Sequence, residues 1–135
     1  MGRRGYPPEF RVFASTHTGL PFAQVVADGR QGRLVINNGS AGLPSFADTT
    51  YGVLTRLSSS LQVPADSLYG ATIGALRSDA LPVRFDHAAW SAGFLAQWPP
   101  GSPGYRAYIG RITSGTHLRL EQAARSGIEL GSHSH

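Results

Sequence analysis

The residues of this sequence that could do chemistry begin with a serine and a histidine two positions apart. Ser15 and His17 lie in the segment FRVFASTHTG, whose aromatic and β-branched residues 10–14 predict a strand. In extended chain, residues i and i+2 project to the same side, so both side chains would face one site at the end of the strand. His17 would be either a metal ligand or a loop histidine hydrogen-bonded to the backbone. Ser15 offers a neutral hydroxyl, which is a poor ligand for a divalent metal.

A glycine-rich loop after residues 33–37 is the second candidate. The segment from Asn37 to Gly42 could hold a phosphate through backbone N–H groups. The loop lacks the Gly-Lys-Ser/Thr ending of a P-loop and the spacing of a dinucleotide-binding motif. Because Asn and Gly tolerate positive φ, the alternative is a tight turn that closes the sheet.

The remaining histidines have simpler explanations. His87 follows Asp86, an arrangement that could serve acid–base chemistry, but Asp86 also stands where a helix N-cap is expected. His87 would then be an exposed residue of the first turn. His117 has no partner visible in the sequence, and His133 and His135 lie in a terminal tail, where disorder is common.

Hydrophobic patterning predicts an α+β fold in which strands come first and helices last. The expected strands, mostly antiparallel, cover residues 10–14, 22–27, 33–37, 51–57, 68–76 and 81–85. Two or three helices at the C-terminal end, expected over residues 87–98, 105–112 and 118–124, would pack on the sheet.

Finer expectations follow from single residues. The last strand pair is expected to turn around Ser78-Asp79, and Gly127 to cap the final helix. The aromatic residues Trp90, Phe94 and Trp98 recur at helical spacing and are expected to pack in the core. Residues 1–9 read as an irregular N-terminus, residues 10–126 as the C-terminal part of a domain and residues 127–135 as a disordered tail.

Composition excludes several function classes. The 135 residues contain no cysteine, which removes disulfides, thiolate metal sites and cysteine nucleophiles. No signal-peptide pattern and no apolar run of membrane-spanning length occurs, so we expect a soluble, cytoplasmic protein without a membrane partner. The formal charge is +4 and every basic residue is arginine, but the arginines are spread evenly without an RNA-binding aromatic motif. We therefore do not expect nucleic acid as a partner.

Residues 10–46 resemble the end of the calcineurin-like metallophosphoesterase domain. In that family a strand runs into a Gly-His-x-His turn, and Ala14-Ser15-Thr16-His17 occupies the same place in this sequence. The family then has a hairpin and an Asn-x-Gly-Ser turn, matched by Asn37-Asn38-Gly39-Ser40 with Gly42 and Pro44 after it. The order of the later segments also matches, so the resemblance extends over residues 10–124.

The resemblance implies a partial metallophosphoesterase α/β sandwich. It assigns His17 to metal coordination, with manganese, iron or zinc as the divalent ion, and puts Ser15, Asn38 and Ser40 near that site. Ser15 replaces the first histidine of the family's turn, so the second ion loses a ligand. The other ligand motifs of the family (Asp-x-His, Gly-Asp, Gly-Asn-His-Asp/Glu and a further histidine) do not occur in this chain.

We therefore expect a fragment of a metal-dependent phosphoesterase that is inactive alone, because a catalytic zinc site needs about three protein ligands. Hydrolysis of phosphoric esters would require the missing N-terminal half, whether the chain is a gene fragment or the product of a mis-called start. The alternative is a non-enzymatic interaction module, or a subunit completed by another chain. The expected partners are that N-terminal half or a second copy in a homo-oligomer.

Overall fold

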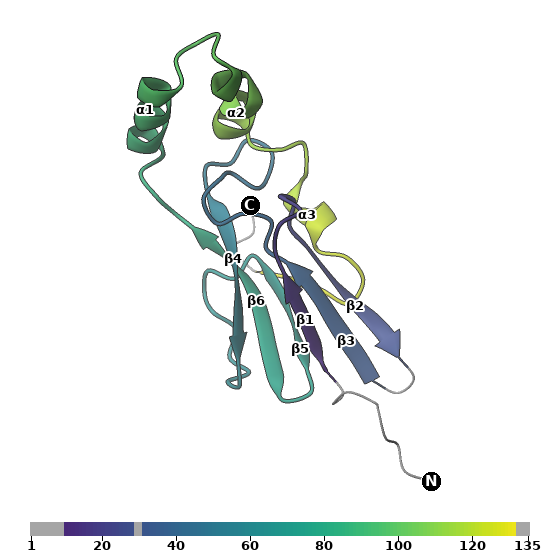
Figure 1. Ribbon diagram of the computed structural model, residues 1–135. Coiled ribbons are helices and arrows are strands. Elements are labelled where there is room, and N and C mark those ends of the chain that lie inside the picture. The colour runs from purple at the N-terminus through teal and green to yellow at the C-terminus, as the bar shows by residue number, and fades with distance from the viewer. Residues whose placement is uncertain (1–9, 29–30, 132–135) are drawn as a thin grey trace.

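The computed structural model describes residues 10–28 and 31–131 (Figure 1). The irregular N-terminus expected over residues 1–9 lies outside this range. Along the chain the described elements are β1 (Val12–Ser15), β2 (Phe22–Asp28), β3 (Gln31–Asn37), β4 (Gly52–Ser58), β5 (Tyr69–Ile73), β6 (Leu76–Val83), α1 (His87–Gln97), α2 (Pro103–Ser114), α3 (Leu120–Ala123) and β7 (Glu129–Leu130). The predicted α+β class, with strands first and helices at the C-terminal end, is confirmed.

The first sheet has the strand order β1-β3-β2. β2 and β3 form an antiparallel hairpin, in which Ala23 lies opposite Ile36. Leu34 and Ile36 of β3 lie two residues apart and are buried, as expected of a strand with one face in the core. β1 runs parallel to β3, so that Ser15 lies opposite Asn37 at the end of both strands. This pairing joins two segments that are far apart in the sequence.

The second sheet is antiparallel throughout, in the order β4-β6-β5-β7. The turn between β5 and β6 lies at Gly74, where φ is 60°, because Ile73 pairs with Leu76. The turn expected around Ser78-Asp79 is therefore wrong. Both residues are buried inside β6. Aspartate favours turns in isolation, but an arginine two residues away neutralises its charge here and stabilises the strand.

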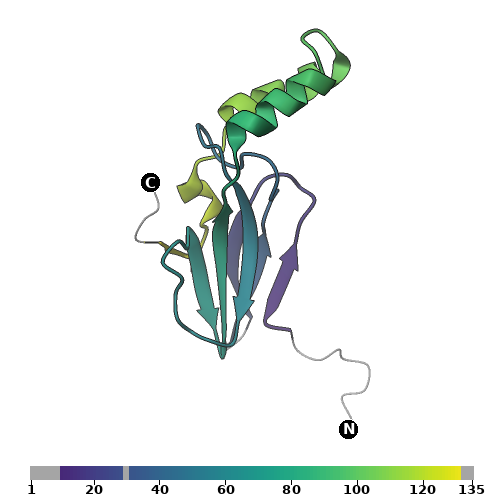
Figure 2. The same cartoon turned by 90° about the vertical axis from the view of Figure 1, so that its left-hand side faces the viewer.

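The core joins the two sheets, which lie side by side in Figure 1 and one behind the other in Figure 2. Its buried side chains come from β2 and β3 of the first sheet, from β4, β5 and β6 of the second, and from α3, with Phe46 contributed by the connecting loop. Gly32 of β3 approaches the end of the Ile73 side chain of β5. The apolar residues of both sheets thus share one cluster, and this cluster fixes the loops at the end of the strands.

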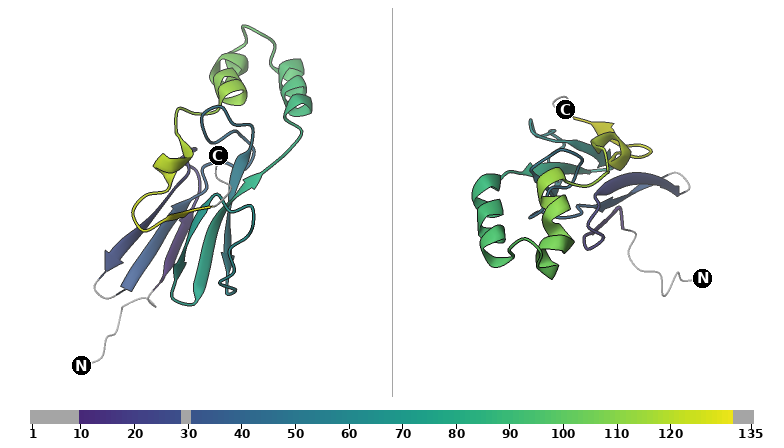
Figure 3. Two further views of the ribbon diagram at one scale, coloured as in Figure 1. Left: turned by 180° about the vertical axis from the view of Figure 1, so that it is seen from behind. Right: turned by 90° about the horizontal axis from the view of Figure 1, so that it is seen from above.

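The helices are arranged differently from the simple layer that the sequence suggests. α1 and α2 form a hairpin that extends past the end of both sheets (Figures 1 and 3), whereas α3 lies against β2, where Ala124 forms a bridge with Ala23. Asp86 is the predicted N-cap of α1, and its side chain accepts a hydrogen bond from the N–H of Ala89. No helix of the described residues is long and apolar enough to cross a membrane.

The core role expected for the aromatic residues of α1 is wrong. Trp90 is 39% exposed and Trp98 is 45% exposed, and no residue of α1 is buried. The aromatic rings contact one another instead: Trp90 stacks on Phe94 with centroids 5.9 Å apart, and Trp98 lies against Gly104 of α2. Helical spacing brought the rings to one side of α1, but no sheet lies opposite them.

The chain is ordered past the point where a disordered tail was expected to begin. Glu129–Leu130 forms β7 and pairs with Tyr69 and Gly70 of β5. The tail expected over residues 127–135 is therefore corrected for residues 127–131, and residues 132–135 lie outside the described range. Gly127 has a φ of 78°, but it does not cap α3, whose C-cap is Ala124.

Candidate functional site

His17 occupies a tight turn directly after β1. Its side chain is exposed, and its backbone φ of 95° lies in the left-handed region that few residues other than glycine adopt. Gly19 in the same turn also has positive φ, 79°. A histidine held in a costly backbone conformation points to a constraint other than packing, since its side chain packs against nothing in the core.

Asn37 joins this turn to the loop after β3. Its Nδ2 donates to Ser15 Oγ at 3.1 Å and to the carbonyl oxygen of Thr16 at 3.3 Å, and its Oδ1 accepts from the N–H of Gly39 at 2.8 Å. The side chain is 1% exposed. The structure therefore brings together the two segments singled out in the sequence. The residue that does so is Asn37, which belongs to the candidate loop but was not among the side chains expected to line the site.

The three expected site-lining residues all stabilise loops. Ser15 Oγ accepts the hydrogen bond from Asn37. Asn38 Nδ2 donates to the carbonyl oxygen of Val53 at 2.9 Å, which ties the loop to the second sheet. Ser40 Oγ accepts from the N–H of Gly42 at 3.3 Å, as in a turn. They lie near His17 in the fold, but their polar atoms are engaged within the protein.

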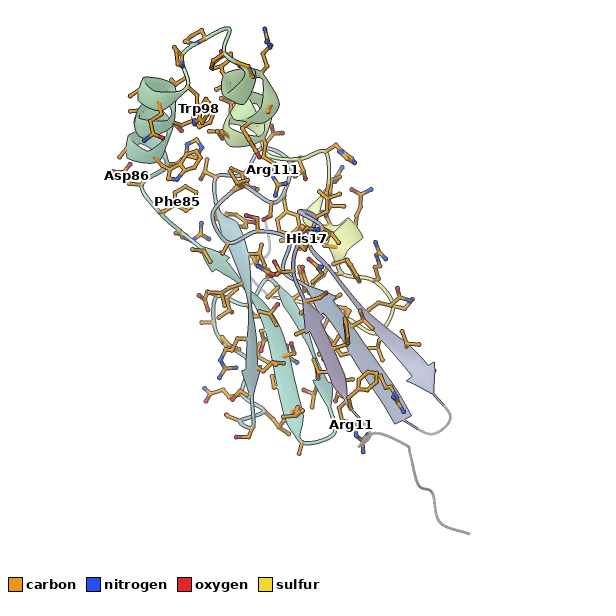
Figure 4. All side chains as sticks on the ribbon, viewed as in Figure 1. Arg11, His17, Phe85, Asp86, Trp98 and Arg111 are labelled. Atoms are coloured by element: carbon orange, nitrogen blue, oxygen red, sulfur yellow. The ribbon has the colours of Figure 1, made fainter. Side chains whose placement is uncertain are left out.

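Arg111 of α2 reaches the same end of the sheets and was not expected at the site (Figure 4). Its Nη2 donates to the carbonyl oxygen of Gly19 at 2.7 Å, and its Nε donates to the carbonyl oxygen of Pro44 at 2.9 Å. The guanidinium of Arg111 thus holds the turn at His17 against the loop after β3 that contains Pro44. Burial lowers the pKa of Arg111 from its ordinary value. The sequence carries no signal for this contact because Arg111 resembles every other arginine of the chain.

The described residues do not by themselves fit a divalent metal. No three side chains of His, Asp or Glu in residues 10–28 and 31–131 are close enough together to hold an ion. His17 could be one ligand, whereas a catalytic zinc needs about three from the protein. The Asp86–His87 pair does not form an acid–base couple either, since Asp86 caps α1 and His87 Nε2 lies 2.7 Å from the carbonyl oxygen of Ile112.

A second polar cluster lies inside β6. Asp79 is fully buried and accepts hydrogen bonds from Arg77 and from Ser67 Oγ, the latter at 2.7 Å. Hydrogen bonding to Asp79 raises the pKa of Arg77 further above its ordinary value. Arg56 Nη1 lies 3.7 Å from the same carboxylate, and Glu129 of β7 approaches Arg77 from the other side at 3.5 Å. The cluster joins β4, β6 and β7, which indicates a structural role.

Two cavities lie away from the His17 turn. One of about 380 Å³ is bordered by Tyr51, Asp48 and Arg119, and one of about 320 Å³ by Arg56 and Leu81. Neither contains the residues that the sequence singled out.

No protein-family model, no curated protein and no solved structure matches the chain. The resemblance to metallophosphoesterases therefore stays a prediction.

Proposed function

We propose that this chain is the C-terminal portion of a metal-dependent phosphoesterase of the metallophosphoesterase type. In this proposal it supplies His17 to a metal site whose other ligands come from outside the described residues. Alone, the chain does not hydrolyse phosphate esters. Manganese, iron or zinc would be the ion in the completed site.

One observation carries the proposal: the segment that ends in His17 and the Asn37 loop meet at one end of the first sheet. The resemblance requires this meeting, and the meeting depends on the parallel pairing of β1 with β3, which no pattern in the sequence predicted. The hydrogen bond from Asn37 to Ser15 joins residues 22 positions apart, so it results from the tertiary fold and not from closeness in the sequence. The imidazole of His17 is exposed, so it could share a metal ion with ligands from another polypeptide.

The test is a metal titration of the purified chain, followed by an activity assay. Manganese is paramagnetic, so it should broaden the imidazole NMR signals of His17 at lower concentration than those of His117, which is also exposed but lies far along the chain. With p-nitrophenyl phosphate and its bis-ester we expect no turnover above the metal-only blank. Equal broadening of both histidines would remove His17 as a ligand. Turnover that His17→Ala abolishes and His117→Ala preserves would contradict the inactivity.

A second candidate, a non-enzymatic interaction module, is favoured by the open side of β1. No described strand pairs with β1 on the side away from β3. Phe13 of β1 and Phe10 just before it are 55% and 48% exposed and contact each other edge to face at 6.4 Å. A strand in parallel pairing is rarely left uncovered, and an exposed edge with aromatic side chains pairs readily with another chain.

For this candidate the occupant is a second copy of the chain. Sedimentation velocity should then detect a dimer at micromolar concentration, and Phe13→Lys should shift it toward monomer because a charged edge opposes strand pairing. Tyr108→Lys, at a similarly exposed aromatic residue of α2, is the matched control and should leave the distribution unchanged. A wild-type monomer at all concentrations would argue against the module.

A further inference from the structure

The guanidinium of Arg111 carries a charge that no described carboxylate neutralises. Its hydrogen-bond partners are the carbonyl oxygens of Gly19 and Pro44. The ion pairs among residues 10–28 and 31–131 involve other arginines. Carbonyl oxygens satisfy donors but leave the positive charge in place, and a partly buried charge without a counter-ion is costly. The remaining N–H donors of the guanidinium have no partner in the described part of the chain.

The turn beside Arg111 offers further donors. The backbone N–H groups of residues 17–20 donate no hydrogen bond within the described residues. His17 and Gly19 both have positive φ, so the peptide planes of this turn do not follow a regular strand. Successive free N–H groups in such turns form concave sites for anions. Arg111 Nη2 lies 2.7 Å from the carbonyl oxygen of Gly19, which brings the guanidinium to the edge of the same turn.

We propose that Arg111 and the turn of residues 17–20 form a binding site for a small oxyanion, such as phosphate or a carboxylate. A guanidinium and free backbone N–H groups are the donors that such anions accept from in proteins. The site does not depend on His17 as a metal ligand, so it goes beyond the proposed phosphoesterase function. The alternative is that Arg111 is solely a clamp between two loops, in which case the carbonyl contacts are its whole role and no anion binds.

The experiment titrates the metal-free chain with inorganic phosphate, at constant ionic strength set by chloride, and follows ¹H–¹⁵N NMR signals. We expect saturable shifts of the Arg111 Nε–Hε signal and of the amides of Thr18 and Gly19. Arg106, exposed on the same helix, should show no saturable shift of its Nε–Hε signal. Acetate in a parallel titration distinguishes a carboxylate site from a phosphate site. Absence of saturable shifts with both anions would overturn the inference.

The variants give an independent readout. Arg111→Gln should weaken phosphate binding about tenfold or more, because a charge-assisted hydrogen bond is lost. Arg106→Gln should bind phosphate like the wild type. Arg111→Lys should bind phosphate with intermediate affinity, since lysine keeps the charge but loses the planar set of N–H donors. Wild-type affinity in Arg111→Gln would contradict the site. If that variant fails to fold, the wild-type shifts decide. Because this titration uses the metal-free chain, saturable phosphate shifts without manganese broadening at His17 would separate this site from the metal-ligand proposal.

Discussion

Arg77 and Asp79 lie two residues apart on β6 and form a buried ion pair, with Arg77 Nη2 2.7 Å from Asp79 Oδ1 and Nε 3.2 Å from both carboxylate oxygens. Their exposed fractions are 3% and 0%. Residues i and i+2 share one face of a strand, so the pair forms within β6 itself. Ser67 Oγ completes the hydrogen bonding of the carboxylate. This pair allows an aspartate to lie in the middle of a strand.

Removing the carboxylate charge should destabilise the protein strongly. Asp79→Asn leaves Arg77 buried without its counter-ion, and we expect the free energy of unfolding to fall by about 3 kcal/mol. Glu129→Gln, at the 71%-exposed end of the same cluster, is the control and should change it by less than about 1 kcal/mol. Urea unfolding followed by circular dichroism measures both. If Asp79→Asn lowered the free energy of unfolding as little as Glu129→Gln does, the buried ion pair would not be stabilising the protein.

The hydroxyl of Tyr69 should make the protein sensitive to alkaline pH. The residue is fully buried, its hydroxyl has no hydrogen-bond partner in the described residues, and burial together with the nearby Tyr51 raises its pKa. The stability that this raised pKa confers is fully present below about pH 10, the pKa of an unfolded tyrosine, and is lost as pH rises through the folded pKa.

Tyr69→Phe tests this linkage. Removing an unpaired buried hydroxyl should raise the free energy of unfolding at neutral pH by about 1 kcal/mol. It should also reduce the loss of stability above about pH 10. Urea unfolding across the alkaline range gives both quantities. Tyr108→Phe, on an exposed side chain, should leave both unchanged. A Tyr69→Phe variant with an unaltered alkaline decline would contradict the linkage.

The turn at His17 should be strained. Since its φ is 95°, His17→Gly is expected to raise the free energy of unfolding by about 1 kcal/mol, because glycine adopts positive φ without steric cost. His117 is also exposed but lies outside the residues with positive φ, so His117→Gly should lower stability or leave it unchanged. Thermal unfolding of both variants decides. A loss of stability in His17→Gly would mean that the imidazole itself stabilises the turn.

Alanine substitutions at two glycines of α2 should have different effects on stability. Gly110 has open space around it, so Gly110→Ala should raise stability by about 1 kcal/mol through helix propensity. A side chain at Gly104 would clash with the ring of Trp98. Gly104→Ala should therefore displace that ring, change the tryptophan fluorescence and give no comparable gain. Unchanged fluorescence in Gly104→Ala would contradict the contact between α1 and α2.

What the sequence determined by itself is the local structure. The β2–β3 hairpin follows from two apolar strands joined by a short turn, and α1 begins directly after its predicted N-cap, Asp86, and ends before Pro99-Pro100. The α+β order follows from the same patterns. These features depend on hydrogen bonds and steric preferences within a few residues, which the sequence displays directly.

Only the tertiary structure decided which distant residues meet. Arg111 contacts carbonyl groups 92 and 67 positions away, and Asn37 holds a turn 22 positions before it. Asp79 lies inside a strand because a charged neighbour offsets the cost of its burial, whereas Trp90 stays exposed because no sheet lies opposite α1. Local propensity cannot express these outcomes. They depend on which surfaces the two sheets leave exposed when they pack. Many weak contacts between distant parts of the sequence determine that packing.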